Sequence, residues 1–327
     1  MIEARAVVIT KPGAPEVLEI QPRTIRDPGP GEVRIAVAAA GLNRADCIQR
    51  RGFYPAPPGA PADIPGLEYA GTIERVGEGV ALEVGTPVMG ITGGGGMCTH
   101  LLAHEREVIA VPTGTSLEQA AAIPEAFMTA YDAMLLQSEL VRGEVVLIHA
   151  VASGVGTAGL QLAAAIGATA VGTSRSAEKL GRCAELGLRH AIDTSGGAFA
   201  SALKDAFPRG ADVIVDVIGA SYAAENLAAV ASTGRIITLG LLGGMKAEVD
   251  LGLVLRKRVT WRGSVLRARP LEEKGVLAQR FARELVPLFE SGALRPIVDE
   301  VMPMEKIVDA HRRMEANETF GKLVLRW

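Results

Sequence analysis

Residues 145–167, VVLIHAVASGVGTAGLQLAAAIG, limit the possible folds of this chain more than any other stretch. The apolar run at residues 145–149 predicts a buried parallel strand, and a glycine-rich turn then leads directly into a helix of small residues. Gly154, Gly156 and Gly159 satisfy the spacing G-x-G-x-x-G. In such a βα unit the first glycine permits a tight turn, the second lets backbone N–H groups approach a pyrophosphate, and the third lets helix and strand pack closely. We therefore expect the helix N-terminus to hold the phosphates of a dinucleotide.

A lone G-x-G-x-x-G is a weak signal, but the residues that follow it alternate between strand and helix patterns. Helices are predicted up to residue 167 and around residues 177–186, 199–206 and 223–230. The predicted strands are residues 145–149, 169–172, 191–193, 213–217, 235–239 and 259–264. Six short strands with helices between them are typical of a doubly wound parallel sheet, the Rossmann α/β architecture.

The segments before and after this region have different residue patterns. Up to residue 103, turns rich in Gly and Pro separate strand-like runs, which predicts a compact antiparallel β-barrel with a short helix near residues 44–51. These runs are residues 4–10, 32–40, 69–76, 87–92 and 99–103. A helical pattern covers residues 117–136, with Ser116 as N-cap and a break or kink at Pro124. At the other end, helices at residues 271–290 and 306–317 precede a final strand at residues 321–326, and we expect this tail to fold back onto the barrel.

Length and charge restrict the classes of protein. At 327 residues the chain exceeds the size at which one hydrophobic core usually keeps growing, so two domains are expected. Its 34 basic and 37 acidic residues give a net charge of −3, which argues against a nucleic-acid or anionic-membrane partner. No apolar run is long enough to span a membrane, and the first residues lack the pattern of a secretory signal. We expect a cytoplasmic protein.

The spacing of cysteines and histidines does not favour a metal site. Cys47, Cys98 and Cys183 lie far apart, without a C-x-x-C pair. His100 and His104 are the only close histidines, and an i, i+4 pair binds a metal from one face of a helix. Their segment instead has the pattern of a turn running into a strand. We predict no metal.

The end of the second predicted strand indicates which dinucleotide binds. NAD-binding units carry an acidic residue about 20 residues after the glycines, where it holds the ribose 2′-hydroxyl, and this chain has none there. Instead Ser174 offers a hydroxyl, while Arg175 and Lys179 offer positive charge to a 2′-phosphate. The pattern favours NADP(H) over NAD(H). The alternative is that Ser176 caps a helix and that the two cations are merely solvated.

Taken together, these segments resemble the medium-chain dehydrogenase/reductase superfamily, and within it the zinc-independent quinone oxidoreductases, above all their p53-inducible branch. The resemblance runs almost end to end. Its segments are GLNRADCIQRRGFYPAPPG, PGLEYAGTIERVGEGV, AAAIPEAFMTAYDAM, VVLIHAVASGVGTAGLQLA, DVIVDVIG, GRIITLGLLGG, GSVLRAR and MEANETFGKLVL. It implies a GroES-like β-barrel catalytic domain made of residues 1–122 and 267–327, and a Rossmann NADP(H)-binding domain made of residues 123–266.

Two positions distinguish the chain from the zinc alcohol dehydrogenases of that superfamily. Asn43 stands where those enzymes have a ligand cysteine, and Leu67 where they have a ligand histidine. An amide is a poor zinc ligand and leucine is none, so no catalytic zinc is expected. The structural-zinc lobe with its four cysteines is absent as well. Glu68 remains from the motif, and we interpret it as a structural hydrogen-bonding residue rather than an acid catalyst.

The resemblance also implies roles for single residues. Asn43 and Tyr54 fall on positions that line the nicotinamide cleft, and Tyr54 can stack or donate a hydrogen bond near the transferred hydride; ordinary packing is the alternative. Lys322 either reaches the cofactor from the returning tail or is an exposed strand lysine. We interpret His149 as a packed core histidine rather than a proton donor. The other expected cofactor contacts are Ser153, Gly154, Val155, Gly156, Ser174, Arg175, Lys179, Gly240, Leu241, Ser264, Val265 and Leu266.

One departure weakens the resemblance at the 2′-phosphate. The family's phosphate-contacting tyrosine after the third strand is Thr194 in this chain. Arg175 is the candidate that would compensate for it.

These features predict an NADPH:quinone oxidoreductase, with NADPH bound across the cleft between barrel and nucleotide domain. Hydride transfer is the cofactor's own reaction, so the protein supplies orientation and excludes water, and the quinone oxygen takes its proton from solvent or from Tyr54. An NADPH-dependent reductase of activated alkenes, such as enones or enoyl thioesters, is one alternative, although only Arg50 and Arg51 offer a basic rim for an acyl-CoA. A non-catalytic NADPH-binding redox sensor is another.

The expected macromolecular partner is a second copy of the chain. The strand at residues 235–240 and the apolar run at residues 259–266 would place a sheet edge at the end of the nucleotide domain. Pairing of two such edges in a homodimer would cover it.

Overall fold

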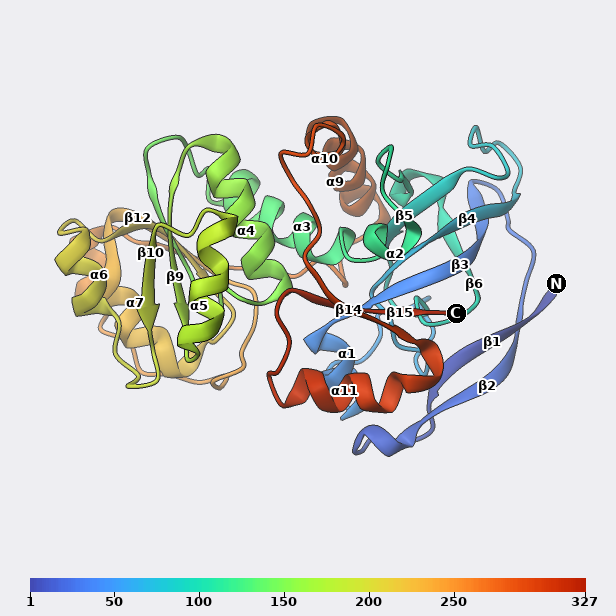
Figure 1. Cartoon of the computed structure of the whole chain (residues 1–327), viewed down its shortest axis with the longest axis horizontal. Coiled ribbons are helices and arrows are strands. Elements are labelled where there is room, and N and C mark those ends of the chain that lie inside the picture. Colours follow the sequence, from blue (N-terminus) through green and yellow to red (C-terminus); the bar gives the residue numbers. More distant parts are fainter. The chain divides into compact units, whose positions relative to one another are not determined.

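The computed structural model describes residues 1–327 and divides into two compact units (Figure 1). Unit 1 comprises Met1–Met128 and Leu266–Trp327, and unit 2 comprises Thr129–Val265. The first division falls later than the predicted change at residue 123. Phe127 explains the difference, because its ring packs edge-on against that of Phe289, 4.8 Å away between centroids, and so belongs to unit 1.

Unit 2 contains the predicted doubly wound sheet. All its strands pair in parallel, in the order β10-β9-β8-β11-β12-β13. They are β8 (Val145–Ile148), β9 (Thr169–Ser174), β10 (His190–Asp193), β11 (Ala211–Asp216), β12 (Val230–Thr238) and β13 (Thr260–Gly263). Leu147, Val171, Ile214 and Ile236 form part of one buried apolar cluster. The chain order reverses between β8 and β11, and in open α/β sheets ligands bind at such a point, beyond the carboxyl ends of the strands.

Helices pack on this sheet, and α4 contacts both β8 and β9. Those of unit 2 are the π-helix η3 (Asp132–Gln137), α4 (Gly154–Ile166), α5 (Ala177–Cys183), η4 (Ala184–Leu186), α6 (Ala200–Ala206), η5 (Ala220–Tyr222), α7 (Ala223–Ala229) and α8 (Leu251–Lys257). Helix α8 was not predicted. None of its side chains is buried, and its main sequence signal is Asp250, whose carboxylate accepts a hydrogen bond from Leu253 N at 3.1 Å.

Unit 1 is built on a mostly antiparallel sheet of seven strands, ordered β14-β15-β3-β4-β5-β7, with β6 also paired to β3 and a separate hairpin of β1 and β2. The strands are β1 (Ile2–Ile9), β2 (Leu18–Ile25), β3 (Glu32–Leu42), β4 (Glu68–Val76), β5 (Pro87–Ile91), β6 (His100–His104), β7 (Ile109–Ala110), β14 (Val298–Pro303) and β15 (Lys322–Arg326). The predicted strands are present, and His100 and His104 lie on a strand as expected. The two-residue strand β7 was missed, and so were β2 and β14. The latter two have solvent-exposed residues along much of their length, which weakens the alternating apolar pattern.

The C-terminal tail returns to the first part of the chain, as predicted. Strand β15 runs antiparallel to β3, so that Leu323 pairs with Leu42. Helix α11 (Ile307–Glu315) packs against α1 (Arg44–Arg50) and the two last strands (Figure 1). The other helices of unit 1 are η1 (Pro15–Val17), η2 (Glu105–Glu107), α2 (Leu117–Ala120), α3 (Pro124–Tyr131), whose last three residues belong to unit 2, α9 (Leu271–Glu284), α10 (Val286–Glu290) and η6 (Met304–Lys306).

Prolines interrupt both long helical patterns of the sequence. Pro124 is the first residue of α3 and separates it from α2, which Ser116 caps with its side chain as predicted. The single helix expected at residues 271–290 is wrong. It ends at Glu284 and restarts at Val286, because Pro287 has no N–H to continue the hydrogen-bond ladder.

Candidate functional site

Asn43 lies where β3 ends and α1 begins, and both ends of its amide are bonded to protein. Nδ2 donates to Glu68 Oε1 at 2.9 Å, and Oδ1 accepts from Lys322 Nζ at 2.6 Å. Asp46, one helical turn later, accepts from the backbone N–H groups of Asn43 and Gly66 at 2.8 and 2.9 Å. The start of α1 is thereby tied to the segment that leads into β4. We call Asn43, Asp46, Glu68 and Lys322 the polar cluster.

Lys322 and Glu68 form a buried ion pair at the centre of the polar cluster. Nζ lies 2.5 Å from Glu68 Oε1 and also donates to Leu42 O at 3.0 Å, while Glu68 Oε2 accepts from Glu125 N at 2.8 Å. The exposed fractions of the two side chains are 4% and 0%. The exposed-lysine alternative is therefore wrong: Lys322 holds Asn43 and Glu68, and Glu68 has the structural hydrogen-bonding role expected from the sequence.

A neighbouring glycine leaves room for the polar cluster. A Cβ on Gly41 would overlap Glu68 Oε1 and the carbonyl oxygen of Ala121. Any larger residue there would displace the carboxylate from its partners.

Tyr54 is half-buried, and Arg267 holds its segment in place. The guanidinium of Arg267 donates to Tyr54 O at 3.0 Å, Gly93 O at 2.8 Å and Gln49 Oε1 at 2.7 Å. It also lies 4.8 Å from the centre of the Tyr54 ring, within the range of a cation–π contact. Burial raises the pKa of the Tyr54 hydroxyl. Sequence reasoning missed Arg267, whose only signal was a basic residue directly after the run at residues 259–266.

In unit 2, the residues of the glycine-rich loop have partly different roles from those predicted. The left-handed turn falls on Ala150, with φ of 48°, whereas Gly154 is already the first residue of α4. A Cβ on Gly156 would collide with the backbone of Val151, so this glycine permits a close approach within the loop itself. Gly159 does pack against the strand, since a Cβ there would lie 3.1 Å from Ile148 Cδ1.

The N-terminus of α4 fits a dinucleotide phosphate. Ser153 caps the helix by accepting from Gly156 N at 3.1 Å. The N–H groups of Gly154 and Val155, in the first turn, have no intrahelical acceptor and are available to an anion.

The predicted 2′-phosphate residues lie at the carboxyl end of β9. Ser174 is its last residue, Arg175 is exposed, and Lys179 is half-buried in the first turn of α5. Ser176 caps α5 by accepting a hydrogen bond from Lys179 N at 3.3 Å. The helix cap that the sequence analysis gave as an alternative role for this segment is therefore present. Thr194 is buried, and its N–H donates to Ser174 O at 2.9 Å.

The remaining predicted contacts follow the ends of β12 and β13. Gly240 and Leu241 come just after β12, and Ser264 and Val265 just after β13. Ser264 Oγ lies 2.7 Å from Gln137 Nε2, which donates to it. Because parallel strands end at one edge of the sheet, these residues share that edge with the α4 loop and Ser174; we call it the carboxyl edge. Leu266 instead belongs to unit 1 and is 5% exposed.

His149 is a buried core residue, as the sequence analysis favoured. Its Nε2 donates to Asn226 Oδ1 at 2.7 Å, and Nδ1 lies 2.9 Å from the Thr173 hydroxyl. Burial lowers its pKa to about 4, so the ring is neutral at pH 7 and both nitrogens are occupied.

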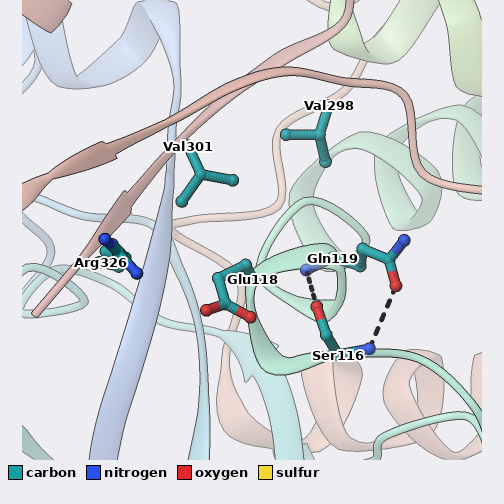
Figure 2. Close-up of a pocket in the computed structure, with 6 residues that line it drawn as sticks. All are labelled: Ser116, Glu118, Gln119, Val298, Val301 and Arg326. Atoms are coloured by element: carbon teal, nitrogen blue, oxygen red, sulfur yellow. Dashed lines mark hydrogen bonds between the residues drawn. The ribbon is translucent and has the colours of Figure 1, made fainter.

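A surface hollow in unit 1 contains none of the predicted site residues. Figure 2 shows its lining: Ser116, Glu118, Gln119, Val298, Val301 and Arg326. Two hydrogen bonds of the Ser116–Gln119 capping box stand beside it. Ser116, Glu118 and Gln119 belong to the start of α2, and the two ionisable residues of the lining, Glu118 and Arg326, form no ion pair.

The residues at the zinc positions do not fit a zinc ion. The amide of Asn43 is engaged at both ends, and Leu67 is an apolar residue with 2% of its surface exposed. No group of three or more His, Cys, Asp or Glu residues has an arrangement that could hold a metal ion. No helix is both long and apolar enough to cross a membrane.

Comparisons with known proteins place the fold in a family. Residues 29–130 match the alcohol dehydrogenase GroES-like domain, and residues 154–283 match the zinc-binding dehydrogenase domain. The quinone oxidoreductase of Pseudomonas aeruginosa is 33% identical to the chain, over 98% of the chain and 99% of that protein. This chain belongs to the medium-chain dehydrogenase/reductase superfamily. Rattus norvegicus has another relative, the synaptic vesicle membrane protein VAT-1 homolog, which is 31% identical over 98% of the chain and 83% of its own length.

Solved structures of this superfamily share both domains with the chain. The CurK enoyl reductase has a TM-score of 0.88 and 28% identity, with 99% of each chain covered. A mycobacterial protein complexed with NADPH has a TM-score of 0.87 and 27% identity, with 99% of this chain and 100% of that chain covered. The chain therefore has the GroES-like and Rossmann domains of the superfamily and is an NAD(P)-dependent oxidoreductase.

Proposed function

We propose that this protein is a zinc-independent oxidoreductase that transfers hydride from NADPH to quinones. The proposal rests on the similarity of the chain, over nearly its full length, to a quinone oxidoreductase. At the two positions expected to bind zinc, the chain has Asn43, whose amide is hydrogen-bonded at both ends, and Leu67. The matching segments favour the p53-inducible branch of these enzymes. NADPH supplies the hydride, and the chain's own task is to bind, orient and exclude water.

Both units contribute residues to this proposal. In unit 2, Ser153, Gly154, Val155 and Gly156 would hold the pyrophosphate, and Ser174, Arg175 and Lys179 the 2′-phosphate. Gly240, Leu241, Ser264 and Val265 would present backbone to the nicotinamide half, to which the prediction adds Leu266. In unit 1, Asn43 and Tyr54 would orient the nicotinamide and the substrate, held by Lys322 and Arg267 respectively.

Steady-state assays with NADPH and a panel of quinones and enones test this proposal. We expect the quinones to be reduced with the higher kcat/KM, and turnover to survive dialysis against EDTA and phenanthroline. Loss of turnover on chelation, with recovery on adding zinc, would contradict the zinc-independent mechanism.

A reductase of activated alkenes is the second candidate, and the similarity to the CurK enoyl reductase favours it. Enoyl thioesters carry a long, anionic carrier when presented as CoA esters. The short segment before Tyr54 offers only two arginines, and Arg50 is buried in an ion pair with Glu315, which leaves Arg51 as the exposed one. Higher kcat/KM for enones than for every quinone of the panel would make this the main function.

We also propose that the chain forms a homodimer through the edge of unit 2. Strand β13 is the last of its sheet, and exposed apolar side chains lie nearby in sequence: Leu241, Leu242, Met245, Leu251 and Leu255. An open strand edge with apolar neighbours is a surface that a second copy would cover. Light scattering should give twice the chain mass of 34.2 kDa, and a monomer at micromolar concentration would contradict the proposal.

A further inference from the structure

Glu125 lies beside the polar cluster, and its carboxyl group has no hydrogen-bond or ion-pair partner. It is the second residue of α3, and its backbone N–H donates to Glu68 Oε2 at 2.8 Å. The carboxylates of Asp46 and Glu68 accept hydrogen bonds from backbone or side chains on both oxygens. The half-buried side chain of Glu125 forms neither a hydrogen bond nor an ion pair. Nothing within the protein therefore uses its proton or its charge.

The charges around Glu125 come from every neighbouring element. Glu68 faces it from β4, Asp46 from α1, Lys322 from β15 and Arg267 from the segment before α9. Burial, followed by the negative charge of Glu68, raises the pKa of Glu125 to about 8, while the two cations oppose the shift. At neutral pH this group is mostly a carboxylic acid with an O–H to donate.

Tyr54 is a further titratable group that interacts with Glu125. After burial, the charge of Glu125 is the next cause that raises the pKa of the Tyr54 hydroxyl above its usual 10. The phenol is therefore a weaker acid than a free tyrosine. General acids work best when their pKa lies near the working pH, a condition that Glu125 meets and Tyr54 does not.

We propose that Glu125 is the proton donor to the reduced substrate and that Tyr54 positions that substrate. This inference rests on the proposed function, whose reductant is NADPH. Hydride, with its electron pair, leaves NADPH and forms a bond to one oxygen of the quinone; the π electrons move through the ring to the other oxygen, which becomes negatively charged as the ring becomes aromatic. The O–H bond of Glu125 breaks and the proton passes to that oxygen, which yields the hydroquinone, NADP⁺ and a Glu125 carboxylate. Solvent then returns the proton.

The same step serves an activated alkene. Hydride forms a bond to the β-carbon, and the π electrons of the alkene form an enolate. The O–H bond of Glu125 breaks and the proton passes to the α-carbon, which gives the saturated product and a Glu125 carboxylate. The role of Glu125 therefore does not depend on which of the two substrate classes is natural.

The variant Glu125→Gln tests the proposal, because the amide keeps the shape of the side chain and cannot give up a proton in this pH range. The matched control is Glu118→Gln. Glu118 is likewise half-buried and second in its helix, but it lines the surface hollow, whose lining includes none of the predicted site residues (Figure 2). Circular dichroism and melting temperature should be the same for wild type and both variants.

Three readouts separate a proton donor from a merely structural residue. For Glu125→Gln, kcat should fall at least tenfold, toward the 10²- to 10⁴-fold typical of a lost general acid, with little change in the dissociation constant for NADPH. Wild-type kcat should decline above about pH 8, and this alkaline decline should disappear in the variant. The infrared band of protonated carboxyls in the free protein at pH 7 should be as strong in Glu118→Gln as in wild type and clearly weaker in Glu125→Gln, where the smaller contribution of Asp46, whose pKa burial raises to about 6, remains. Glu125→Asp should restore part of the rate.

The outcomes distinguish the two proposals. If wild type and Glu118→Gln reduce quinones or enones while Glu125→Gln keeps the full rate and the alkaline decline, the proton-donor role is overturned and the proposed function stands. If wild type turns over neither substrate class with NADPH, the proposed function fails, and the donor role that rests on it fails too. An unchanged infrared band in Glu125→Gln would also overturn the proposal, since it would show that Glu125 is not the protonated group.

Discussion

The polar cluster of unit 1 is built from side chains that bind one another, whereas the cofactor contacts that we propose at the carboxyl edge of unit 2 are largely backbone groups. Each member of the first, Asn43, Asp46, Glu68 and Lys322, has at least one partner within the protein. In the second, the first N–H groups of α4 lack intrahelical acceptors. The difference indicates a rigid frame in unit 1 and is consistent with the anion site that we propose in unit 2. Mutations in the two regions should therefore have different consequences.

The largest expected effect comes from removing a charge of the polar cluster. Lys322→Met would leave the Glu68 carboxylate buried without its cation, and breaking a buried ion pair from one side usually costs about 3–5 kcal/mol. Urea unfolding should show this loss, while Lys11→Met, on the exposed surface, should change stability by less than about 0.5 kcal/mol. A near-neutral Lys322→Met would mean that the cluster is not a rigid frame.

The pH dependence of stability tests whether the core of unit 2 near the carboxyl edge excludes protons from its buried side chains. Burial lowers the pKa of His149 from 6.5 to about 4, so between these pH values the unfolded chain binds a proton that the folded chain does not. Stability should therefore fall as the pH drops from 6.5 to 4, by roughly 3 kcal/mol in total from this group.

The control is the variant His149→Gln, measured by urea unfolding at several pH values. It should lose this part of the slope, although His311, whose pKa burial lowers to about 3, still contributes. An unchanged slope would show that His149 is accessible to protons in the folded state.

Changing charges at the carboxyl edge should affect binding and not folding. Arg175→Ala combined with Lys179→Ala should weaken NADPH by about 1–3 kcal/mol, the size of charge-assisted hydrogen bonds, and leave NADH nearly unchanged. Fluorescence titration of both cofactors measures this, with the exposed Lys204→Ala as control. Equal affinity of the wild type for NADPH and NADH would remove the 2′-phosphate assignment.

The smallest effect separates the helix cap from the ligand site. Ser176 caps α5, and Ser176→Ala should lower stability by about 1 kcal/mol, as lost N-caps do, without changing the preference for NADPH over NADH. Thermal unfolding and the same titration measure the two properties. A lost preference with unchanged stability would assign Ser176 to the cofactor instead.

Much of the fold was predictable because its signals are local. The apolar strands, the glycine spacing and the caps at Ser116 and Ser176 lie within a few residues of the features they specify. The missed elements have weaker local signals: β14 is half exposed at the edge of its sheet, and α8 buries no side chain. At Pro287 the error is the opposite: the amphipathic pattern predicted one continuous helix, although this proline interrupts it.

The candidate site was predictable where it is made of backbone and much less so where it is made of side chains. Gly154, Gly156 and Ser174 follow from their places after strands of a parallel sheet. The partners of Asn43 and Tyr54 do not, because Lys322 and Arg267 are separated from them by 279 and 213 positions.

By itself, then, the sequence determined a doubly wound parallel sheet and the glycine-rich turn that leads into α4, since periodicity and spacing are properties of neighbouring residues. The tertiary structure alone decided the environment of the side chains. Pairing of β15 with β3 brings Lys322 beside Asn43 and Glu68, and the start of α3 brings Glu125 against the same carboxylate. Burial and the charge of Glu68 are what raise the pKa of Glu125 to about 8, and they arise only when segments far apart in the chain pack together.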